Sequence, residues 1–226
     1  NTPSISADGR LIAFDSDSDN FVNGDNNNAF DVFLRDTSTN STRLITAAPN
    51  GAISDGGGFS ASISADGNFV AFSSDGTNLV PQTLSGARDI FLKQVNGGGV
   101  QLISQSSQGA VSQNSNFDPS VSADGRYVAF LTTDDSLANE NNGDPDIVIR
   151  DTRLGTTSLV SRDLDGTPTD TGAFGASITA DGRFVAYSSD SSGGSDPSDG
   201  SNDLGKVFVT DTKTGSVRRV GSGNGG

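Results

Sequence analysis

The sequence contains no histidine, cysteine, methionine or tryptophan. Without histidine and cysteine, the chain can form neither a Ser-His-Asp nor a Cys-His catalytic arrangement, and it cannot build a zinc site from those ligands. It can form no disulfide either, so its cysteine content says nothing about the redox compartment. Glu140 is the only glutamate, so the acid chemistry of the chain depends almost entirely on aspartate.

Helix-favouring residues are scarce and long apolar runs are missing. Serine, threonine, asparagine, aspartate and glycine dominate the 226 residues, which is typical of an all-β, turn-rich protein. No segment is apolar for long enough to insert into a membrane as a helix. The net charge of −14 would repel phosphate backbones and anionic lipids, so no nucleic acid and no membrane surface is expected as a partner. The first residue is Asn1 rather than methionine, which indicates a processed or excised chain from which any signal peptide has been removed.

One unit occurs four times along the chain. Its first block reads SISADGRLIAF (4–14), SISADGNFVAF (62–72), SVSADGRYVAF (120–130) and SITADGRFVAY (177–187). The second block reads DVFLRDT (31–37), DIFLKQV (89–95), DIVIRDT (146–152) and KVFVTDT (206–212). The third block reads TRLIT (42–46), VQLIS (100–104), TSLVS (157–161) and VRRVG (217–221). The unit therefore repeats every 57–58 residues in a constant order.

Each unit is predicted to form four short strands. Asp-Gly between two apolar alternating runs is a tight-hairpin signal, and it joins a short first strand to the second. The third strand is almost wholly apolar, as expected of a strand covered on both faces. Four-stranded antiparallel sheets at a fixed period predict a β-propeller with one sheet per blade, in preference to a β-solenoid. The predicted blades cover approximately 1–46, 47–104, 105–161 and 162–226 of one array, either complete or part of a larger ring.

An apolar residue precedes the predicted first strand of units two to four at a constant offset. These residues are Phe59, Phe117 and Phe174, each four residues before the apolar residue of the first block. Their regular placement predicts packing between neighbouring units.

The repeated pattern S-x-D-G-R-x-(V/I)-A-F, followed by D-(I/V)-F-(L/V)-x-D-x, resembles the TolB-like, WD-repeat-like β-propeller family over the whole chain. The family commonly has proline where this chain has Ala7, Ala65, Ala123 and Ala180. Unit two departs from the pattern at Gln94 and Val95, and unit four departs from it at Lys206. The resemblance implies a secreted protein, extracellular or periplasmic, that binds other proteins or stands beside a partner domain. It implies no catalytic mechanism, because fold does not fix function.

Ring closure is not explained by the repeats alone. The chain starts at the first strand of unit one and ends after the fourth strand of unit four, so no strand is left to complete a shared blade. The native chain continues, or two copies complete a ring, or four blades close without a clasp. An open array would expose apolar sheet faces at both ends, and such faces normally require a partner.

The connection between the second and third strands of unit one, DSDSDNFVNGDNNNAFD (15–31), is rich in oxygen ligands of the kind that Ca²⁺ prefers. It fails as an EF-hand, because its sixth position is not glycine and its twelfth is Asn26. If the strand continues past Phe14, alternation would place Asp15, Asp17 and Asp19 on one face. A compact cluster of Asp25, Asn27 and Asp31 is the alternative.

The corresponding loop of unit three, 131–146, is also acidic, whereas that of unit two, 73–89, has almost no acid beyond the residue next to its third strand. The candidate calcium ligands are therefore Asp17, Asp19, Asp25, Asn27 and Asp31 in unit one, with Asp144 and Asp146 in unit three. For the aspartate that opens the third strand, namely Asp31, Asp89 or Asp146, hydrogen bonding to the backbone is the structural interpretation.

The sequence favours a non-catalytic extracellular interaction or scaffold module, stabilised by calcium through its acidic loops. Its expected partner is another protein or a second copy of the chain, and no enzymatic activity and no other cofactor is expected. One alternative is a structural subunit of a surface assembly or filament, joined at open blade edges. Another is a propeller that binds or cleaves carbohydrate with paired aspartates, although the absence of tryptophan weakens it.

Overall fold

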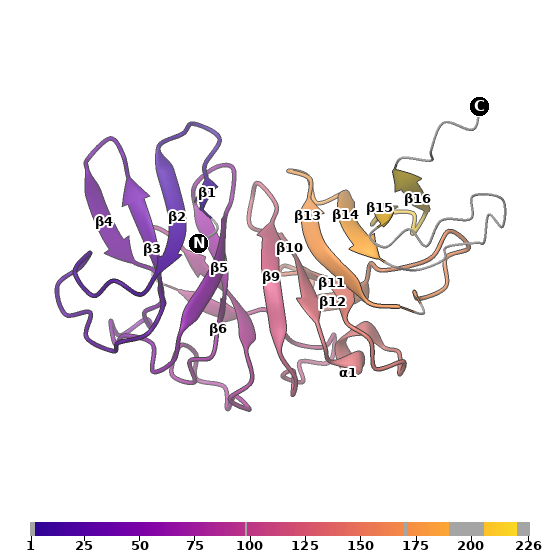
Figure 1. Ribbon diagram of the computed structural model, residues 1–226, viewed down its shortest axis with the longest axis horizontal. Coiled ribbons are helices and arrows are strands. Elements are labelled where there is room, and N and C mark those ends of the chain that lie inside the picture. Colours follow the sequence, from indigo (N-terminus) through magenta and orange to yellow (C-terminus); the bar gives the residue numbers. More distant parts are fainter. Residues whose placement is uncertain (1–2, 98, 170, 190–205, 221–226) are drawn as a thin grey trace.

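The computed structural model describes residues 3–97, 99–169, 171–189 and 206–220. Their strands form four four-stranded antiparallel sheets, which stand side by side as blades in one array (Figure 1). Blade 1 contains β1 (Ser4–Ile5), β2 (Leu11–Ser16), β3 (Asp31–Asp36) and β4 (Ser41–Leu44). Blade 2 contains β5 (Gly58–Ile63), β6 (Phe69–Ser74), β7 (Asp89–Gln94) and β8 (Val100–Leu102).

Blade 3 contains β9 (Asn116–Val121), β10 (Tyr127–Thr132), β11 (Asp146–Asp151) and β12 (Thr156–Leu159). Blade 4 contains β13 (Ala173–Ile178), β14 (Phe184–Ser189), β15 (Lys206–Asp211) and β16 (Val217–Val220). Within the described ranges the only helix is the short α1 (Asp135–Ala138), and it is far too short to cross a membrane. The predicted all-β architecture of four-stranded propeller blades is confirmed.

An Asp-Gly turn joins the first two strands of every blade. In blade 1 the Asp8 carboxylate accepts hydrogen bonds from the Ser6 hydroxyl at 2.5 Å and from the Arg10 amide at 3.0 Å. Gly9 has a φ of 73°, a conformation that side chains disfavour. The same two bonds recur at Asp66, Asp124 and Asp181. These aspartates therefore build turns.

The first strand of blades 2 to 4 is longer than predicted. β5, β9 and β13 span six residues each and contain a register shift, near which Ser60, Asp118 and Gly175 have φ values of 52°, 48° and 68°. A left-handed residue at a bulge interrupts the alternation of side chains, so the sequence pattern placed the strand start too late. Phe59 consequently lies inside β5. Its ring packs against Phe30 of blade 1 with centroids 5.7 Å apart, which confirms the predicted packing between units at this position.

Three hydrophobic clusters form the core, and each lies mainly between two neighbouring blades. Between blades 1 and 2, Val32 and Ile45 pack with Val70 and Phe72, and all four are at most 1% exposed. Blades 2 and 3, and then blades 3 and 4, are joined in the same way. The joints between blades are thus the places where this protein buries most of its apolar surface.

The polar contacts of a joint also repeat. At each joint, the blade that comes first in the chain is here called the leading blade and the next one the following blade. A serine hydroxyl of the leading blade accepts a hydrogen bond from a backbone amide of the following blade: Ser4 from Ile63 at 3.1 Å, Ser62 from Val121 at 3.3 Å and Ser120 from Ile178 at 3.2 Å. A large side chain of the leading blade covers the glycine of the next Asp-Gly turn, as Leu11 covers Gly67, Phe69 covers Gly125 and Tyr127 covers Gly182. A Cβ atom on Gly182 would lie 2.1 Å from the Tyr127 ring, so this approach requires glycine.

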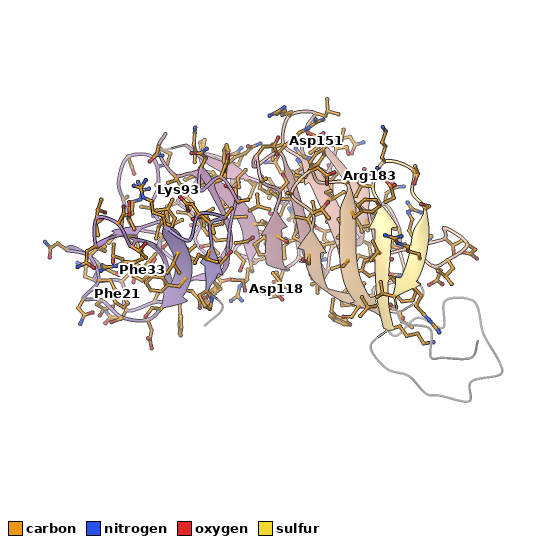
Figure 2. All side chains as sticks on the ribbon, turned by 90° about the horizontal axis from the view of Figure 1, so that it is seen from above. Phe21, Phe33, Lys93, Asp118, Asp151 and Arg183 are labelled. Atoms are coloured by element: carbon orange, nitrogen blue, oxygen red, sulfur yellow. The ribbon has the colours of Figure 1, made fainter. Side chains whose placement is uncertain are left out.

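Blades 1 and 4 stand at opposite ends of the array (Figures 1 and 2). Positions that are buried in the inner joints are exposed there. Ile5 of blade 1 is 59% exposed, whereas Ile63, its counterpart in blade 2, is 6% exposed. Val207 of blade 4 is 42% exposed, whereas its counterpart Ile90 is fully buried. The expected exposure of apolar residues at open ends is therefore observed at both ends.

Candidate functional site

The blades present two different faces. The Asp-Gly turns and the short turns between third and fourth strands emerge on one side, here called the turn face (Figure 1). The long loops between second and third strands, together with the connectors between blades, emerge on the other side, here called the loop face. The candidate sites lie on these two faces and at the two ends of the array.

The blade 1 end carries an aromatic cluster. Phe14 of β2 stacks on Phe33 of β3 with ring centroids 5.7 Å apart. The equivalent pair in blade 2, Phe72 and Phe91, is covered by blade 1. In blade 1 the ring of Phe21, from the following loop, contacts Phe14 and Phe33 at 5.6 and 5.2 Å and remains 43% exposed (Figure 2). Phe21 thus stays partly exposed at the blade 1 end, whereas Leu79, which holds its place in blade 2, is fully buried in the joint with blade 1.

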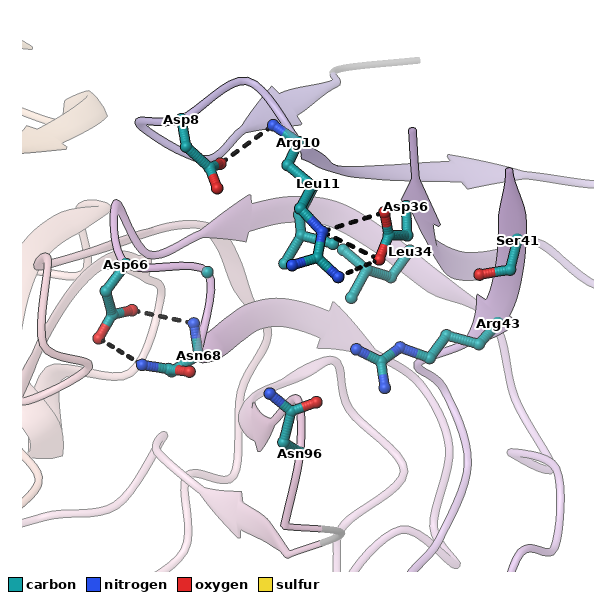
Figure 3. A pocket seen from close by; sticks show the side chains of 11 residues that line it. Asp8, Arg10, Leu11, Leu34, Asp36, Ser41, Arg43, Asp66, Asn68 and Asn96 are labelled. Carbon is teal, nitrogen blue, oxygen red and sulfur yellow. Dashed lines mark hydrogen bonds and ion pairs between the residues drawn. The ribbon is translucent and has the colours of Figure 1, made fainter. Parts of the chain in front are cut away.

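The turn face has grooves between blades. One of about 340 Å³ lies between blades 1 and 2, and one of about 540 Å³ lies between blades 3 and 4. Figure 3 shows that acids of the first groove already have partners: Arg10 pairs with Asp36 at 2.6 Å, and Asn68 donates to Asp66 at 2.9 Å. The guanidinium of Arg10 lowers the pKa of the Asp36 carboxyl. Carboxylates held in this way do not face one another as a free acid and base pair.

The ion pair of the turn face recurs as Arg126–Asp151 and Arg183–Asp211, but blade 2 has Asn68 and Gln94 instead. Asp151 also accepts hydrogen bonds from the backbone amides of Arg153 and Leu154 in the following turn.

We expect Asp151→Ala to destabilise the protein by about 1–2 kcal/mol, because it removes a nearly buried acceptor of several hydrogen bonds. Gln94→Ala, at the corresponding and exposed position of blade 2, should cost less than about 0.5 kcal/mol. Urea denaturation of both variants measures the difference. Equal losses would show that the repeated ion pair and its turn add nothing to stability.

The aspartate that opens the third strand of blades 1 to 3 is buried. Asp31, Asp89 and Asp146 are at most 1% exposed, and each accepts a hydrogen bond from a hydroxyl near the end of the fourth strand. For Asp89 this donor is Ser104 at 2.6 Å, and the Ser104 oxygen in turn accepts the amide of Ile90 at 3.1 Å. Burial raises the pKa of Asp89 to about 6. These contacts support the structural interpretation of the strand-opening aspartates.

On the loop face of blade 1, Asp25 and Asn27 lie close to Asp31. The Asn27 amide nitrogen donates to Asp31 Oδ2 at 2.9 Å and to the Ser54 carbonyl at 3.4 Å. Asp25 is 8% exposed, and its Oδ1 atom is buried without a hydrogen-bond partner. Burial raises the pKa of Asp25, and Asp19 adds to this effect. The predicted compact cluster of Asp25, Asn27 and Asp31 is thus present as an arrangement of side chains.

The other predicted ligands of blade 1 lie differently. β2 ends at Ser16, so alternation does not continue through the acidic run. Asp15 is buried on the strand, whereas Asp17 and Asp19 lie beyond it and are exposed. The three acids do not share one strand face, because the strand stops before the second of them. Within the residues that the structure describes, no group of three or more histidine, cysteine, aspartate or glutamate side chains is close enough to hold a metal.

On the loop face of blade 3, Glu140 lies beside Asp146, although it was not among the ligands predicted from the sequence. Burial raises the pKa of Glu140 to about 8, and its hydrogen bond with Asp146 adds to the increase. Burial also raises the pKa of Asp146. Asp144 is partly buried, and its backbone amide donates to the Asn142 side chain at 3.0 Å. The spacing in the sequence could have indicated this residue, because Glu140 stands six residues before Asp146, as Asp25 does before Asp31. The corresponding loop of blade 4, 190–205, lies outside the described residues.

No family model matches this chain, and no curated protein matches it. Among solved structures, TolB from Acinetobacter baumannii aligns with a TM-score of 0.57 and 20% identity, over 97% of this chain and 42% of that one. The putative TolB from Agrobacterium tumefaciens aligns with a TM-score of 0.59 and 18% identity, over 97% and 64%. The fold is that of a TolB-like β-propeller.

The propeller spans less than two thirds of both TolB chains. A third similar structure is "oligogalacturonate lyase in complex with manganese", with a TM-score of 0.55 and 14% identity, over 97% of this chain and 52% of that one. Identities this low establish the fold alone. Since TolB and a lyase share this fold, the fold does not decide whether this propeller is catalytic.

Proposed function

We propose that this protein is a non-catalytic interaction or scaffold propeller that binds through the two open ends of its blade array. The observation that carries the proposal is that equivalent apolar side chains are exposed at the ends of the array and buried in its inner joints. Val220 at the blade 4 end is 52% exposed, whereas Ile103 and Val160, which occupy the same place in blades 2 and 3, are at most 1% exposed. The ends are therefore surfaces of the kind that each inner blade buries against a neighbour.

The two ends carry complementary halves of the repeated joint. The blade 4 end presents Ser177 and Phe184, which occupy the serine and large-side-chain positions of a leading blade. The blade 1 end presents Gly9, around which a Cβ atom would meet nothing within 4 Å, and the exposed Ile5. A blade 4 end placed against a blade 1 end would thus supply both sides of the same contact.

A basic side chain adds to this complementarity. Lys93 of β7 donates to backbone carbonyls of blade 1, to Ile45 at 2.9 Å and Ala47 at 2.6 Å. Arg150 of β11 donates to carbonyls of the connector that leads into blade 3. Arg35 holds the same place in blade 1 and has no leading blade, so its guanidinium bonds to side chains near its own turn. It is available to the carbonyls of an added blade.

The occupant that fits both ends is a second copy of this chain, docked head to tail. Such a heterologous contact gives a closed ring if the rotation per copy permits closure, and an extended assembly if it does not. The latter outcome is the structural-subunit alternative, and the same open ends favour it. We also propose that the protein is secreted to an extracellular or periplasmic location, which the TolB-like fold supports. Calcium is proposed to stabilise the loop face, which the acidic loops support.

Light scattering coupled to size-exclusion chromatography tests the proposal. We expect the mass to exceed that of a 23.0 kDa monomer and to rise with protein concentration. Arg35→Glu should shift the mass toward the monomer, because it replaces a donor by an acid opposite carbonyl oxygens. A monodisperse monomer at high concentration would contradict the proposal.

A further inference from the structure

The loops of blades 1 and 3 contain the same motif in front of the third strand. They read DNNNAFD (25–31) and ENNGDPD (140–146), with an acid at the first position, asparagine at the third and aspartate at the seventh. The fourth position has positive φ in both loops, 52° at Asn28 and 77° at Gly143. The two segments therefore share their polar side chains at these three positions and a left-handed backbone at the fourth.

Their hydrogen bonds also correspond. The Asn27 side-chain oxygen accepts the Ala29 amide at 3.0 Å, and the Asn142 oxygen accepts the Asp144 amide at the same distance. The nitrogen of each asparagine donates to a connector carbonyl, namely that of Ser54 at 3.4 Å and that of Thr169 at 3.0 Å.

In each motif the asparagine nitrogen contacts one carboxylate oxygen and one carbonyl oxygen. In blade 1 it also contacts Asp31 Oδ2 of the strand at 2.9 Å, and in blade 3 it also contacts Glu140 Oε2 of the loop at 3.4 Å. An N–H group therefore occupies a point among carboxylate and carbonyl oxygens, which is the environment of a hard cation.

The motif of blade 1 leaves an acidic oxygen unsatisfied: Asp25 Oδ1 is buried without a hydrogen-bond partner, and Asp25 as a whole is 92% buried. In blade 3 the carboxyl groups of Glu140 and Asp146 are close enough to hydrogen-bond, so two acidic side chains are held against each other. In the described part of the chain no salt bridge reaches the acids of either motif. A buried carboxylate without a counter-charge is costly, and burial accordingly raises the pKa of both loop acids.

We propose that these two motifs are a duplicated binding site for Ca²⁺. One ion is held by Asp25, Asp31 and the Ser54 carbonyl, and the other by Glu140, Asp146 and the Thr169 carbonyl. The cation displaces the asparagine N–H from these oxygens, and water completes the six to eight ligands that calcium requires. With two carboxylates per ion, the affinity falls in the range of about 10⁻⁴ to 10⁻³ M that is typical of extracellular modules.

Blade 2 is the internal control. Its corresponding loop has Thr83 and Ser85 at the positions of the acid and the asparagine, although Gly86 keeps the positive φ of 82°. Asp89 alone remains, and it should bind no ion. The inference rests on the calcium part of the proposed function and is independent of the open ends, since it is measured by binding and not by mass.

Isothermal titration of the full chain with CaCl₂, after treatment with a chelator, tests the site. We expect two calcium ions per chain for the unaltered protein, one for Asp25→Asn, one for Glu140→Gln and none for the double variant. Asp118→Asn, a control at an exposed acid, should still bind two. Calcium should raise the melting temperature of the unaltered protein and leave that of the double variant unchanged.

Both substitutions preserve side-chain shape, and circular dichroism verifies that the variants fold. Absence of calcium binding by the unaltered protein at millimolar calcium would overturn the proposal, and so would full binding by the double variant. A failure of this kind would leave the mass measurement on the open ends unaffected.

Discussion

Aspartate in place of Ile90 is expected to unfold the protein, whereas aspartate in place of Val207 should leave it folded and abolish its assembly. The two residues hold the same position in β7 and β15, but Ile90 is fully buried between blades 2 and 3 and Val207 is 42% exposed. A carboxylate in the inner joint would cost on the order of 5 kcal/mol or more, which is comparable with the total stability of a typical domain. At the open end the same change should cost less than about 1 kcal/mol.

Circular dichroism and light scattering on both variants measure these effects together. Ile90→Val, a change that keeps the joint apolar, is the control for Ile90→Asp and should remain folded. If Val207→Asp assembled like the unaltered chain, the blade 4 end would not be an interface. If Ile90→Asp stayed folded, the joint between blades 2 and 3 would not be the dry core described here.

Asp89→Asn is expected to stabilise the protein at neutral pH and to change little at acid pH. Asp89 is fully buried, and its Oδ2 atom has no hydrogen-bond partner. Burial raises its pKa from 3.8 to about 6, so the folded state favours the neutral carboxyl group. The stabilising contribution is complete below about pH 4 and is lost as the pH rises through about 6. The loss amounts to about 2–3 kcal/mol by linkage.

Urea denaturation of the unaltered protein and of Asp89→Asn between pH 4 and pH 8 measures this effect. The difference in unfolding free energy between the two proteins should grow with pH and level off above about pH 7. Other titrating groups are present in both proteins, so their contributions cancel and the difference reports on Asp89 alone. A pH-independent difference would show that Asp89 has the same pKa in the folded and unfolded states. Ser104→Ala, which removes the donor to Asp89, should increase the pH dependence.

The repeat made the blades predictable from sequence. A tight turn follows from local chemistry, so Asp8 and Gly9 located the hairpins correctly. The start of β5 was not predictable in the same way, because Ser60 adopts a left-handed conformation that interrupts the alternation of side chains, and its hydroxyl bonds to Asp118 of the next blade. Phe59 was recognised as a packing residue but placed outside the strand to which it belongs.

The candidate calcium site was only partly predictable. Composition drew attention to the run that contains Asp17 and Asp19, but these side chains are exposed beyond the end of β2. Asp25 and Glu140 share a position in the sequence, six residues before the aspartate that opens the third strand. This shared position is visible only when the two loops are aligned on Asp31 and Asp146. The contribution of connector carbonyls could not be inferred from side-chain types, since it depends on how the connector folds against the loop.

The central claim is that the two ends of the array are halves of one joint. Disulfide trapping tests this claim most directly. The chain has no cysteine, so Ile5→Cys and Ser177→Cys give single-cysteine proteins without background. Ser62→Cys with Val121→Cys in one chain is the matched internal pair, because the Ser62 hydroxyl accepts the Val121 amide at 3.3 Å.

We predict that a mixture of the two single-cysteine proteins forms a mixed disulfide rapidly under mild oxidation, at a rate close to that of the internal pair once assembled. Each protein alone should form little disulfide, since a head-to-tail contact does not bring two copies of one end together. Equal amounts of mixed and self-paired dimers, formed slowly, would contradict the account.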